Sequence, residues 1–457
     1  MRRLFLVTAE TVLLFAAGLT AIRIRFGIES SSVLFNDRGW LKLVMLTAVI
    51  QLAFYLFDLY DLPATRRYHR VAFKIVVALG VATVLLSILF YMVPELQLGR
   101  GVFLVDVTLI LAIIPVWRLI VTWSAGHPQL GVRERVLILG SGDQAIELAR
   151  ATLERRASGF HIVGFVDNKP ELVGKSLINP SVIGLTDEIS SIVERHQVDR
   201  IVVAVADRRG KFPTEELLNL TLSGRVAVEE SARYYERLTG KIASELLRPS
   251  WLIFSRGNRF SDFEYHVRRV LNAGFAAIGF VLSLPIMLLT ALAVKLESRG
   301  PIFYVQERVG QNGRAFKIIK FRSMRVGAED SSGPVWAEEG DPRATRVGRI
   351  IRKLRFDELP QFVNVLRGDM NFVGPRPERP VFVDRLCEEV KYYSQRHVVK
   401  PGLTGWAQIK YPYGASVEDA IEKLRYDLYY IKNQSLLLDA IILFETIKIV
   451  LFGRGGR

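Results

Sequence analysis

Four apolar stretches near the start of the chain limit what it can fold into. They cover roughly residues 4–22, 40–57, 71–93 and 102–121. Each is close to the ~20 residues that a helix needs to cross a bilayer. The first begins MRRLFL like a signal peptide, but three more stretches follow with short polar loops, which favours an uncleaved anchor. We therefore predict a four-helix transmembrane bundle over residues 1–126.

Basic residues between the stretches predict the orientation of this region, because cytoplasmic loops are enriched in them. Arg2 and Arg3 before the first stretch, and Arg66, Arg67 and Arg70 between the second and third, place these two segments in the cytoplasm. Three basic residues in the first outer loop weaken this orientation, namely Arg23, Arg25 and Arg38. Four spans return the chain to its starting side, so we expect residues after about 122 to be cytoplasmic. Bundle packing or nearness to helix ends explains most of the charged residues within these stretches, which are Glu10, Lys74, Asp106 and Arg118.

The composition supports a membrane protein. The chain of 457 residues is 50% hydrophobic, with a mean hydropathy of +0.23 and a net charge of +15. Such a charge favours contact with anionic membrane lipid or phosphorylated substrates. We expect no nucleic acid partner, because the sequence has no recognition motif for one. The single cysteine, Cys387, excludes an internal disulfide, and no histidine pair has the spacing of a zinc site.

A Rossmann-like domain is predicted over residues 130–245. A composition shift at His127 and Pro128 precedes it, and RVLILGSGDQAIELARATLE then reads as a strand, a glycine turn and a helix. Further strands are predicted at 161–168 and 199–207, with a helix between them at about 186–196. Their continuous apolar runs are typical of a parallel sheet.

The glycine turn of this domain carries Gly140 and Gly142, with Ala145 in the third small position. Such a turn can hold a pyrophosphate at a helix N-terminus. However, Asp167 lies further along than the usual ribose-binding acid. Two interpretations stay open, a nucleotide-binding turn or a scaffolding or regulatory module.

An uncharged segment of 25 residues, 270–294, allows two topologies. Its length suits a fifth span, which would move the following residues to the other side of the membrane. Pro285 lies in the middle and removes a helix hydrogen bond, so a helix that breaks there and turns back is the alternative. Ser283 is positioned to satisfy a freed backbone group near the break.

The last third of the chain concentrates the polar motifs. FKIIKFRSM (316–324) reads as a strand with Lys320 and Arg322, and RATRVGRIIRKLRFDELPQ (343–361) has five cations between Arg346 and Arg355. Three further motifs follow, namely MNFVGPRPERP with Arg376, the glycine-rich KPGLTGWAQI, and the helical LRYDLYYIKN with Asp427.

Asp357 and Glu358 are adjacent acids that suit phosphoryl transfer. A carboxylate can attack a phosphoryl centre, and Mg²⁺ prefers one or two carboxylates together with phosphate oxygens. Arginine grips phosphate through paired hydrogen bonds. One acid as nucleophile and one as metal ligand is therefore a credible site. The alternative is a solvated helix end with local salt bridges.

The order and spacing of KFRSM, DELPQ, VGPRP and KPGLTGWAQ resemble those of the bacterial polyprenyl-phosphate phosphoglycosyltransferases of the monotopic superfamily. The whole chain resembles the large members that start exopolysaccharide or lipopolysaccharide O-antigen synthesis. The resemblance implies transfer of a sugar phosphate from a UDP-sugar to polyprenyl phosphate, with release of UMP. It implies a catalytic domain over residues 264–457.

The resemblance also implies roles for individual residues. Asp357 is expected to be the nucleophile, and Glu358 to hold Mg²⁺ or assist proton transfer. Substrate-binding roles are implied for Lys320, Arg322, Arg352, Arg376 and Asp427.

Family members carry a proline-broken re-entrant helix, which favours the hairpin, here at about residues 268–297. The usual Ser-Pro is replaced by Ser283-Leu284-Pro285. The expected location is the bacterial inner membrane, with the catalytic domain on the cytoplasmic face. The Rossmann-like domain offers a surface for a homodimer. Residues 435–452 are expected to form an interfacial amphipathic helix.

Two other functions remain as alternatives. A membrane-anchored nucleotide-sugar dehydratase or epimerase needs a Tyr-x-x-x-Lys pair, but Leu238 and Thr239 follow Tyr234 and Tyr235 at that spacing. A non-enzymatic scaffold that senses nucleotide would not require the intact DELPQ and PRP motifs. No residue discriminates between glucose and galactose as the sugar.

Overall fold

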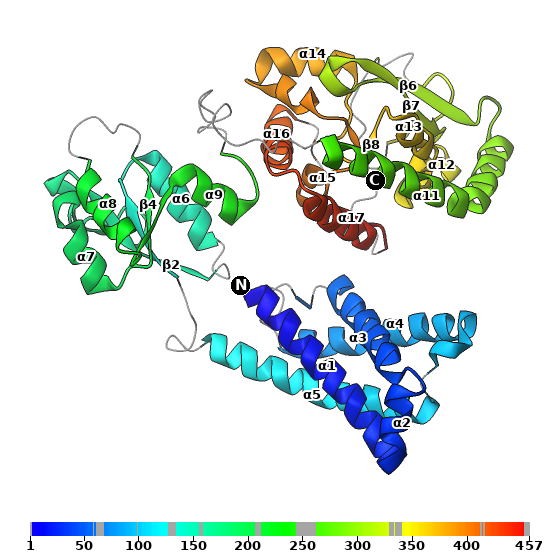
Figure 1. Cartoon of the computed structure of the whole chain (residues 1–457). Coiled ribbons are helices and arrows are strands. Elements are labelled where there is room, and N and C mark those ends of the chain that lie inside the picture. Colours follow the sequence, from blue (N-terminus) through cyan, green and yellow to red (C-terminus); the bar gives the residue numbers. More distant parts are fainter. Residues whose placement is uncertain are drawn as a thin grey trace. The chain divides into compact units, whose positions relative to one another are not determined.

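A computed structural model (Figure 1) describes residues 2–57, 59–60, 68–97, 99–126, 134–154, 159–205, 212–243, 262–328, 333, 341–411, 414 and 416–451. Several features of the sequence analysis fall outside these ranges. They are Arg66, Arg67, the composition shift at His127 and Pro128, and the predicted domain boundaries at 130, 245 and 457.

Four long helices occupy the first part of the chain, where the apolar stretches predict them. They are α1 (Arg2–Phe26), α3 (Gly39–Leu56), α4 (Tyr68–Met92) and α5 (Arg100–Gly126), with the short α2 (Ser30–Phe35) between the first two. With α11 (Asp262–Glu297), the described residues contain five helices long and apolar enough to cross a membrane. The prediction of a membrane protein is therefore confirmed.

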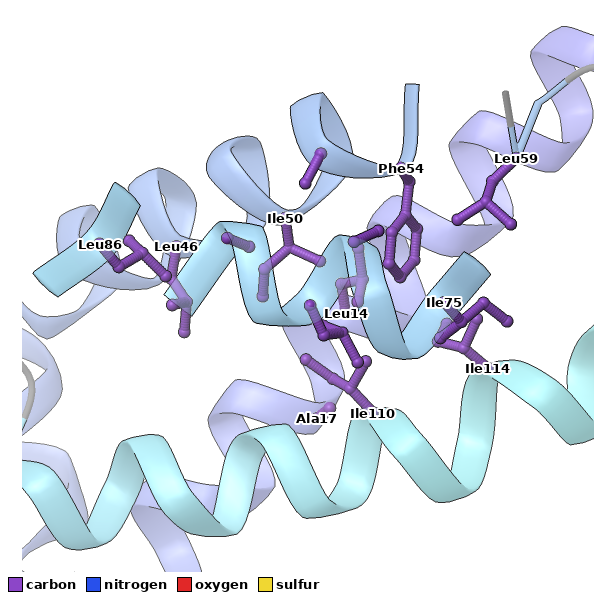
Figure 2. Close-up of a cluster of buried hydrophobic side chains, with 14 of the residues drawn as sticks. Leu14, Ala17, Leu46, Ile50, Phe54, Leu59, Ile75, Leu86, Ile110 and Ile114 are labelled. Atoms are coloured by element: carbon purple, nitrogen blue, oxygen red, sulfur yellow. The ribbon is translucent and has the colours of Figure 1, made fainter. Parts of the chain in front are cut away.

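The four long helices share one cluster of buried apolar side chains (Figure 2). Leu14 of α1, Ile50 of α3, Ile75 of α4 and Ile110 of α5 are each at most 2% exposed. Many apolar side chains on the outer faces are exposed, such as Phe73 and Leu104 at 70% each. A helix group with apolar residues both inside and outside is suited to a lipid environment.

A buried ion pair joins α1 to α5. The Nε atom of Arg118 lies 2.5 Å from Oε1 of Glu10, and both side chains are at most 2% exposed. Arg118 also donates to the carbonyl of Leu59, beyond the end of α3. This pairing gives both charges a packing role, which was the expected explanation for them.

The middle of the chain forms a five-stranded sheet in the order β3-β2-β1-β4-β5. Its strands are β1 (Glu134–Leu139), β2 (Phe160–Asp167), β3 (Val182–Leu185), β4 (Arg200–Val203) and β5 (Ala227–Glu230). β2 and β3 pair in parallel, with Phe165 opposite Val182. The predicted α/β region with a parallel sheet is thus confirmed. Sequence reasoning did not identify β3 or β5, which are only four residues long.

Helices alternate with these strands. They are α6 (Asp143–Glu154), α7 (Ile189–His196), α8 (Thr214–Leu222) and α9 (Ser231–Thr239). Gly140, between β1 and α6, has a φ of +113°, and an added Cβ would lie 2.8 Å from the carbonyl oxygen of Ala204. Only glycine fits that position. An added Cβ at Gly142 would meet nothing within 4 Å, so this glycine is not required by packing.

α11 is one helix of 36 residues, and Pro285 lies inside it. Its outer surface is apolar, with Val270, Ile278, Leu282 and Leu288 between 59% and 73% exposed. Its apolar length alone is consistent with either predicted topology.

The C-terminal domain begins with an antiparallel pair, β6 (Phe303–Val309) and β7 (Ala315–Phe321), in which Tyr304 lies opposite Lys320. A second, parallel pair joins β8 (Asn371–Val373) to β9 (Gly402–Thr404). The helices are α12 (Arg346–Lys353), α13 (Phe362–Arg367), α14 (Pro380–Glu389), α15 (Trp406–Lys410), α16 (Val417–Lys432) and α17 (Leu436–Leu451). The described residues of this domain also form three 3-10 segments, η8 (Gln311–Gly313), η9 (Phe356–Gln361) and η10 (Tyr393–Val398).

We predict that Glu10→Gln lowers the thermal unfolding midpoint of the detergent-solubilised protein. The change leaves Arg118 charged and buried without its carboxylate, which typically costs about 3–5 kcal/mol. The double variant Glu10→Leu/Arg118→Leu should recover much of this loss, because it removes both charges from the apolar core. Glu29→Gln, at an exposed position, is the control. Equal midpoints for Glu10→Gln and wild type would contradict the prediction.

Candidate active site

The paired acids lie just beyond the end of the basic helix α12. Thr345 caps the start of that helix by accepting a hydrogen bond from the backbone N–H of Gly348 at 2.9 Å. The helix ends at Lys353, and Arg355 then adopts a left-handed backbone with a φ of +61°. This reversal starts η9, which carries Asp357 and Glu358 in its first turn. Asp357 therefore lies one short turn beyond the end of α12.

Glu358 is surrounded by cations from three parts of the domain. Its Oε1 accepts hydrogen bonds from Nζ of Lys320 at 3.1 Å and from Nη2 of Arg376 at 2.9 Å. Nη1 of Arg355 lies 3.7 Å from the same oxygen. The Glu358 side chain is 11% exposed, so these charges interact with little screening by water. The alternative of a solvated helix end does not describe this pair.

The two acids have opposite ionisation behaviour. Burial, and then the neighbouring Glu358 carboxylate, raise the pKa of Asp357 to about 6. Burial also opposes ionisation of Glu358, but Lys320, Arg376 and Arg355 together outweigh it and hold the pKa of Glu358 well below its usual range. Divergent pKa values in adjacent acids are a frequent property of catalytic pairs.

Asn364 fixes the position of the strand that carries Lys320. This residue of α13 is fully buried, and its Oδ1 accepts from the backbone N–H of Ile319 at 3.1 Å. Its Nδ2 donates to the carbonyl of Lys317 at 2.8 Å. Sequence reasoning missed Asn364, because nothing in its neighbourhood distinguishes it from an ordinary helix residue.

Three other predicted residues are not in contact with Glu358. Arg322 follows β7 and donates to the carbonyls of Ser298 and Arg299 at 2.9 Å, so it holds the segment after α11. Arg352 is partly exposed in the last turn of α12. Asp427 is 1% exposed and is paired with Arg396 at 2.7 Å.

Sequence reasoning also missed cations around this site. Arg355 was noticed only as one of a run of basic residues, although its charge faces Glu358. Arg308 of β6 and Arg396 of η10 are both near Arg376 in space but far from it in sequence. No local pattern could have linked them to the acids.

Glu358 and Asp357 are the residues of this site that could hold a Mg²⁺ ion, with a substrate supplying the remaining ligands. Among the described residues, no group of three or more His, Cys, Asp and Glu side chains could hold a metal. Mg²⁺ typically takes only one or two carboxylates and completes its shell with phosphate oxygens and water. Glu358, which is ionised, is the better ligand of the two. Asp357 is the second available carboxylate.

We predict that Asp357→Asn stabilises the folded protein near pH 7.5. The folded state raises the pKa of Asp357 from 3.8 to about 6. Between about pH 4 and pH 6 the folded state therefore binds more protons than the unfolded state. Stability from this group therefore falls as pH rises from about 4 to 6. Removing the charge should recover on the order of 1–3 kcal/mol at pH 7.5 and little at pH 4. Thermal unfolding at both pH values measures this.

The exposed residue Asp384 provides the control for this prediction. Asp384→Asn should leave the unfolding midpoint nearly unchanged at both pH values. A lower midpoint for Asp357→Asn at pH 7.5 would show that the folded protein does not disfavour the Asp357 charge.

Two protein-family models match different parts of the chain. Residues 263–453 match the model of the bacterial sugar transferases, and residues 55–211 match the model of a CoA-binding domain. The first match contains both acids, all five predicted substrate-binding residues and α11.

Individual relatives extend the match over most of the chain. This chain is 42% identical over 260 residues to the UDP-N-acetylgalactosamine-undecaprenyl-phosphate N-acetylgalactosaminephosphotransferase of Aeromonas hydrophila. The matched residues cover 57% of this chain and 60% of the relative. This chain is 32% identical to the undecaprenyl-phosphate glucose phosphotransferase of Komagataeibacter xylinus, covering 76% and 65%. It is 31% identical to the UDP-galactose-lipid carrier transferase of Erwinia amylovora, covering 78% and 76%.

The chain thus spans about 60–65% of the length of the first two relatives. It covers three quarters of the third at 31% identity. The resemblance of the motifs agrees with these matches. This chain belongs to the bacterial sugar transferase family.

Proposed function

We propose that this protein transfers a sugar phosphate from a UDP-sugar to polyprenyl phosphate, as the undecaprenyl phosphate in its relatives' names suggests. The product would start a repeat unit of exopolysaccharide or O-antigen. The observation that carries this proposal is the buried Asp357 next to Glu358, whose charge is offset by Lys320 and Arg376.

Asp357 is the proposed nucleophile. Its carboxylate oxygen attacks the β-phosphorus of the UDP-sugar, the bond from that phosphorus to the bridging oxygen breaks, and UMP leaves with the bond electrons. The sugar phosphate then remains on Asp357 as an acyl phosphate. A phosphate oxygen of polyprenyl phosphate attacks the same phosphorus and releases the Asp357 carboxylate. With a pKa of about 6, Asp357 is mostly ionised at neutral pH and ready to attack.

Cations at the site have two proposed roles. Before substrate binds, they offset the charge of Glu358, and with substrate present Lys320 and Arg376 also bind the diphosphate. Glu358 would hold Mg²⁺, which neutralises charge on the diphosphate when it is bound. Arg352 is a further candidate for substrate contact, because it is partly exposed on α12, the helix that precedes the acids.

Contacts at both ends of α11 support the re-entrant topology. Near its start, Arg268 pairs with Asp439 of α17 at 2.7 Å, and at its end Glu297 accepts from the backbone N–H of Val347 at 3.1 Å. A straight helix of 36 residues would be about 54 Å long. A helix that bends at Pro285 brings both ends to one domain, and hence to one side of the membrane.

The proposed location follows from the substrates. UDP-sugars are cytoplasmic, and polyprenyl phosphate is in the membrane, so the site belongs at the cytoplasmic face of the bacterial inner membrane. The four N-terminal helices are then a transmembrane bundle. A homodimer through the α/β region, and nucleotide binding at Gly140 and Gly142, stay predictions without a contact that supports either.

One prediction tests the nucleophile. Asp357→Asn should lower UMP release from a UDP-sugar by about 10³-fold or more, because the reaction loses its attacking group. Asp384→Asn should retain wild-type activity. A panel of UDP-glucose, UDP-galactose and UDP-N-acetylgalactosamine identifies the sugar, since the relatives' names differ in it. Peptide mass spectrometry should find the phosphosugar on Asp357, and an adduct on another residue would disprove this assignment.

A second prediction tests the topology of α11. In a variant without Cys387, cysteines introduced singly at the exposed positions Tyr265 and Arg299 should react with a membrane-impermeant maleimide from the same side. In a separate labelling of the wild-type protein, the exposed native Cys387 reports the side of the C-terminal domain. Ser31→Cys marks the opposite side. Labelling of Tyr265→Cys and Arg299→Cys from opposite sides would establish a fifth span instead.

A further inference from the structure

The segment that carries Arg376 is held by its carbonyl groups. Prolines flank Arg376 on both sides, and each fixes its own φ and has no N–H to donate. The proline that follows also restricts Arg376 to an extended backbone. The segment Pro375–Pro377 can therefore be fixed in the domain mainly through groups that donate to its carbonyls.

Backbone donors hold the first residue of this segment and the residue that directly follows it. The N–H of Gly402 in β9 donates to the carbonyl of Pro375 at 2.9 Å. The N–H of Val309 at the end of β6 donates to the carbonyl of Glu378 at 2.9 Å. These bonds fix where the chain enters and leaves the segment, but they leave the two carbonyls between them to other donors.

Two arginine side chains supply those donors. Nη2 of Arg396 donates to the carbonyl of Arg376 at 3.1 Å. Nη1 of Arg308 donates to the carbonyl of Pro377, also at 3.1 Å. All four consecutive carbonyls from Pro375 to Glu378 thus accept a hydrogen bond, one from β9, one from η10 and two from β6. The Arg376 side chain leaves this fixed backbone and reaches Glu358 at 2.9 Å.

Arg396 is itself held tightly. It is 5% exposed, its Nη2 lies 2.7 Å from Oδ2 of Asp427 in α16, and its Nη1 donates to the hydroxyl of Tyr393 at 2.6 Å. Asp427 is 2% exposed at its side chain. A buried ion pair contributes little net stability compared with apolar residues of similar volume. A role in fixing geometry would explain why this position carries charged groups.

We propose that Arg396, oriented by Asp427, is a positioning residue that holds the backbone of Arg376 so that its guanidinium faces the acids and the diphosphate. This inference rests on the proposed function. It gives Asp427 a role different from the expected substrate contact. In this proposal Asp427, which is 1% exposed, acts through Arg396 and the carbonyl of Arg376.

A double-mutant cycle separates positioning from general stabilisation. If Arg396 acts only through Arg376, its replacement should matter little once Arg376 has been changed. The variants are Arg396→Lys, Arg376→Lys and the double variant, each as the full chain in lipid nanodiscs. UMP release is measured with the UDP-sugar that the wild-type protein uses best. Arg385→Lys is the matched control, because Arg385 is an exposed arginine paired only at the surface with Glu389.

We expect Arg396→Lys to lower kcat/KM for the UDP-sugar by about 10- to 100-fold in the wild-type background, mainly by raising KM. In the Arg376→Lys background the same change should cost less than about 3-fold. Arg385→Lys should cost less than 2-fold in both. Asp427→Asn should reproduce the non-additive pattern, and it replaces Arg396→Lys in the cycle if that variant does not fold.

Equal factors in the two backgrounds would overturn the positioning role, since they would show that Arg396 acts independently of Arg376. Wild-type UMP release distinguishes this outcome from failure of the proposed function. If the wild-type protein releases UMP and the effects are additive, only the positioning role is wrong. If it releases no UMP from any UDP-sugar, the proposed function is wrong.

Discussion

The pairing of the Glu358 carboxylate with Lys320 and Arg376 is the interaction on which the rest of the C-terminal domain depends. A carboxylate that is 11% exposed needs cations close to it, and Lys320 and Arg376 meet it from two separate segments. Burial, and then the ionised Glu358, favours the protonated form of Asp357 and raises its pKa. The ionisation of Asp357 therefore depends both on its own burial and on the way the domain holds Glu358.

Holding these cations in place accounts for much of the surrounding structure. Asn364 ties β7 to α13 through the backbone on both sides of Ile318, which fixes the strand that presents Lys320. The proline segment presents Arg376 in a comparable way, through donors to its carbonyls. In both cases a buried side chain bonds to the backbone of a segment whose cation contacts Glu358.

The second constraint is the membrane. α11 has an apolar surface, yet its two ends bond to the same domain, through Arg268 and through Glu297. Arg322 adds to the attachment at Glu297 by donating to the carbonyls of Ser298 and Arg299, which directly follow the helix. This arrangement ties the domain that contains the acids to the helix that meets the lipid. It suits the reaction that we propose, between a soluble nucleotide sugar and an acceptor that stays in the bilayer.

The sequence by itself determined the apolar helices, the α/β middle region and the motif around Asp357 and Glu358, because hydrophobic period, glycine turns and clustered charge are local signals. It could not separate the predicted substrate-binding residues by role. Only the tertiary structure showed that Lys320 and Arg376 meet Glu358, whereas Arg322 binds backbone carbonyls and Asp427 is buried against Arg396. These differences depend on contacts between segments far apart in the chain, and no local pattern encodes which cation reaches which carboxylate.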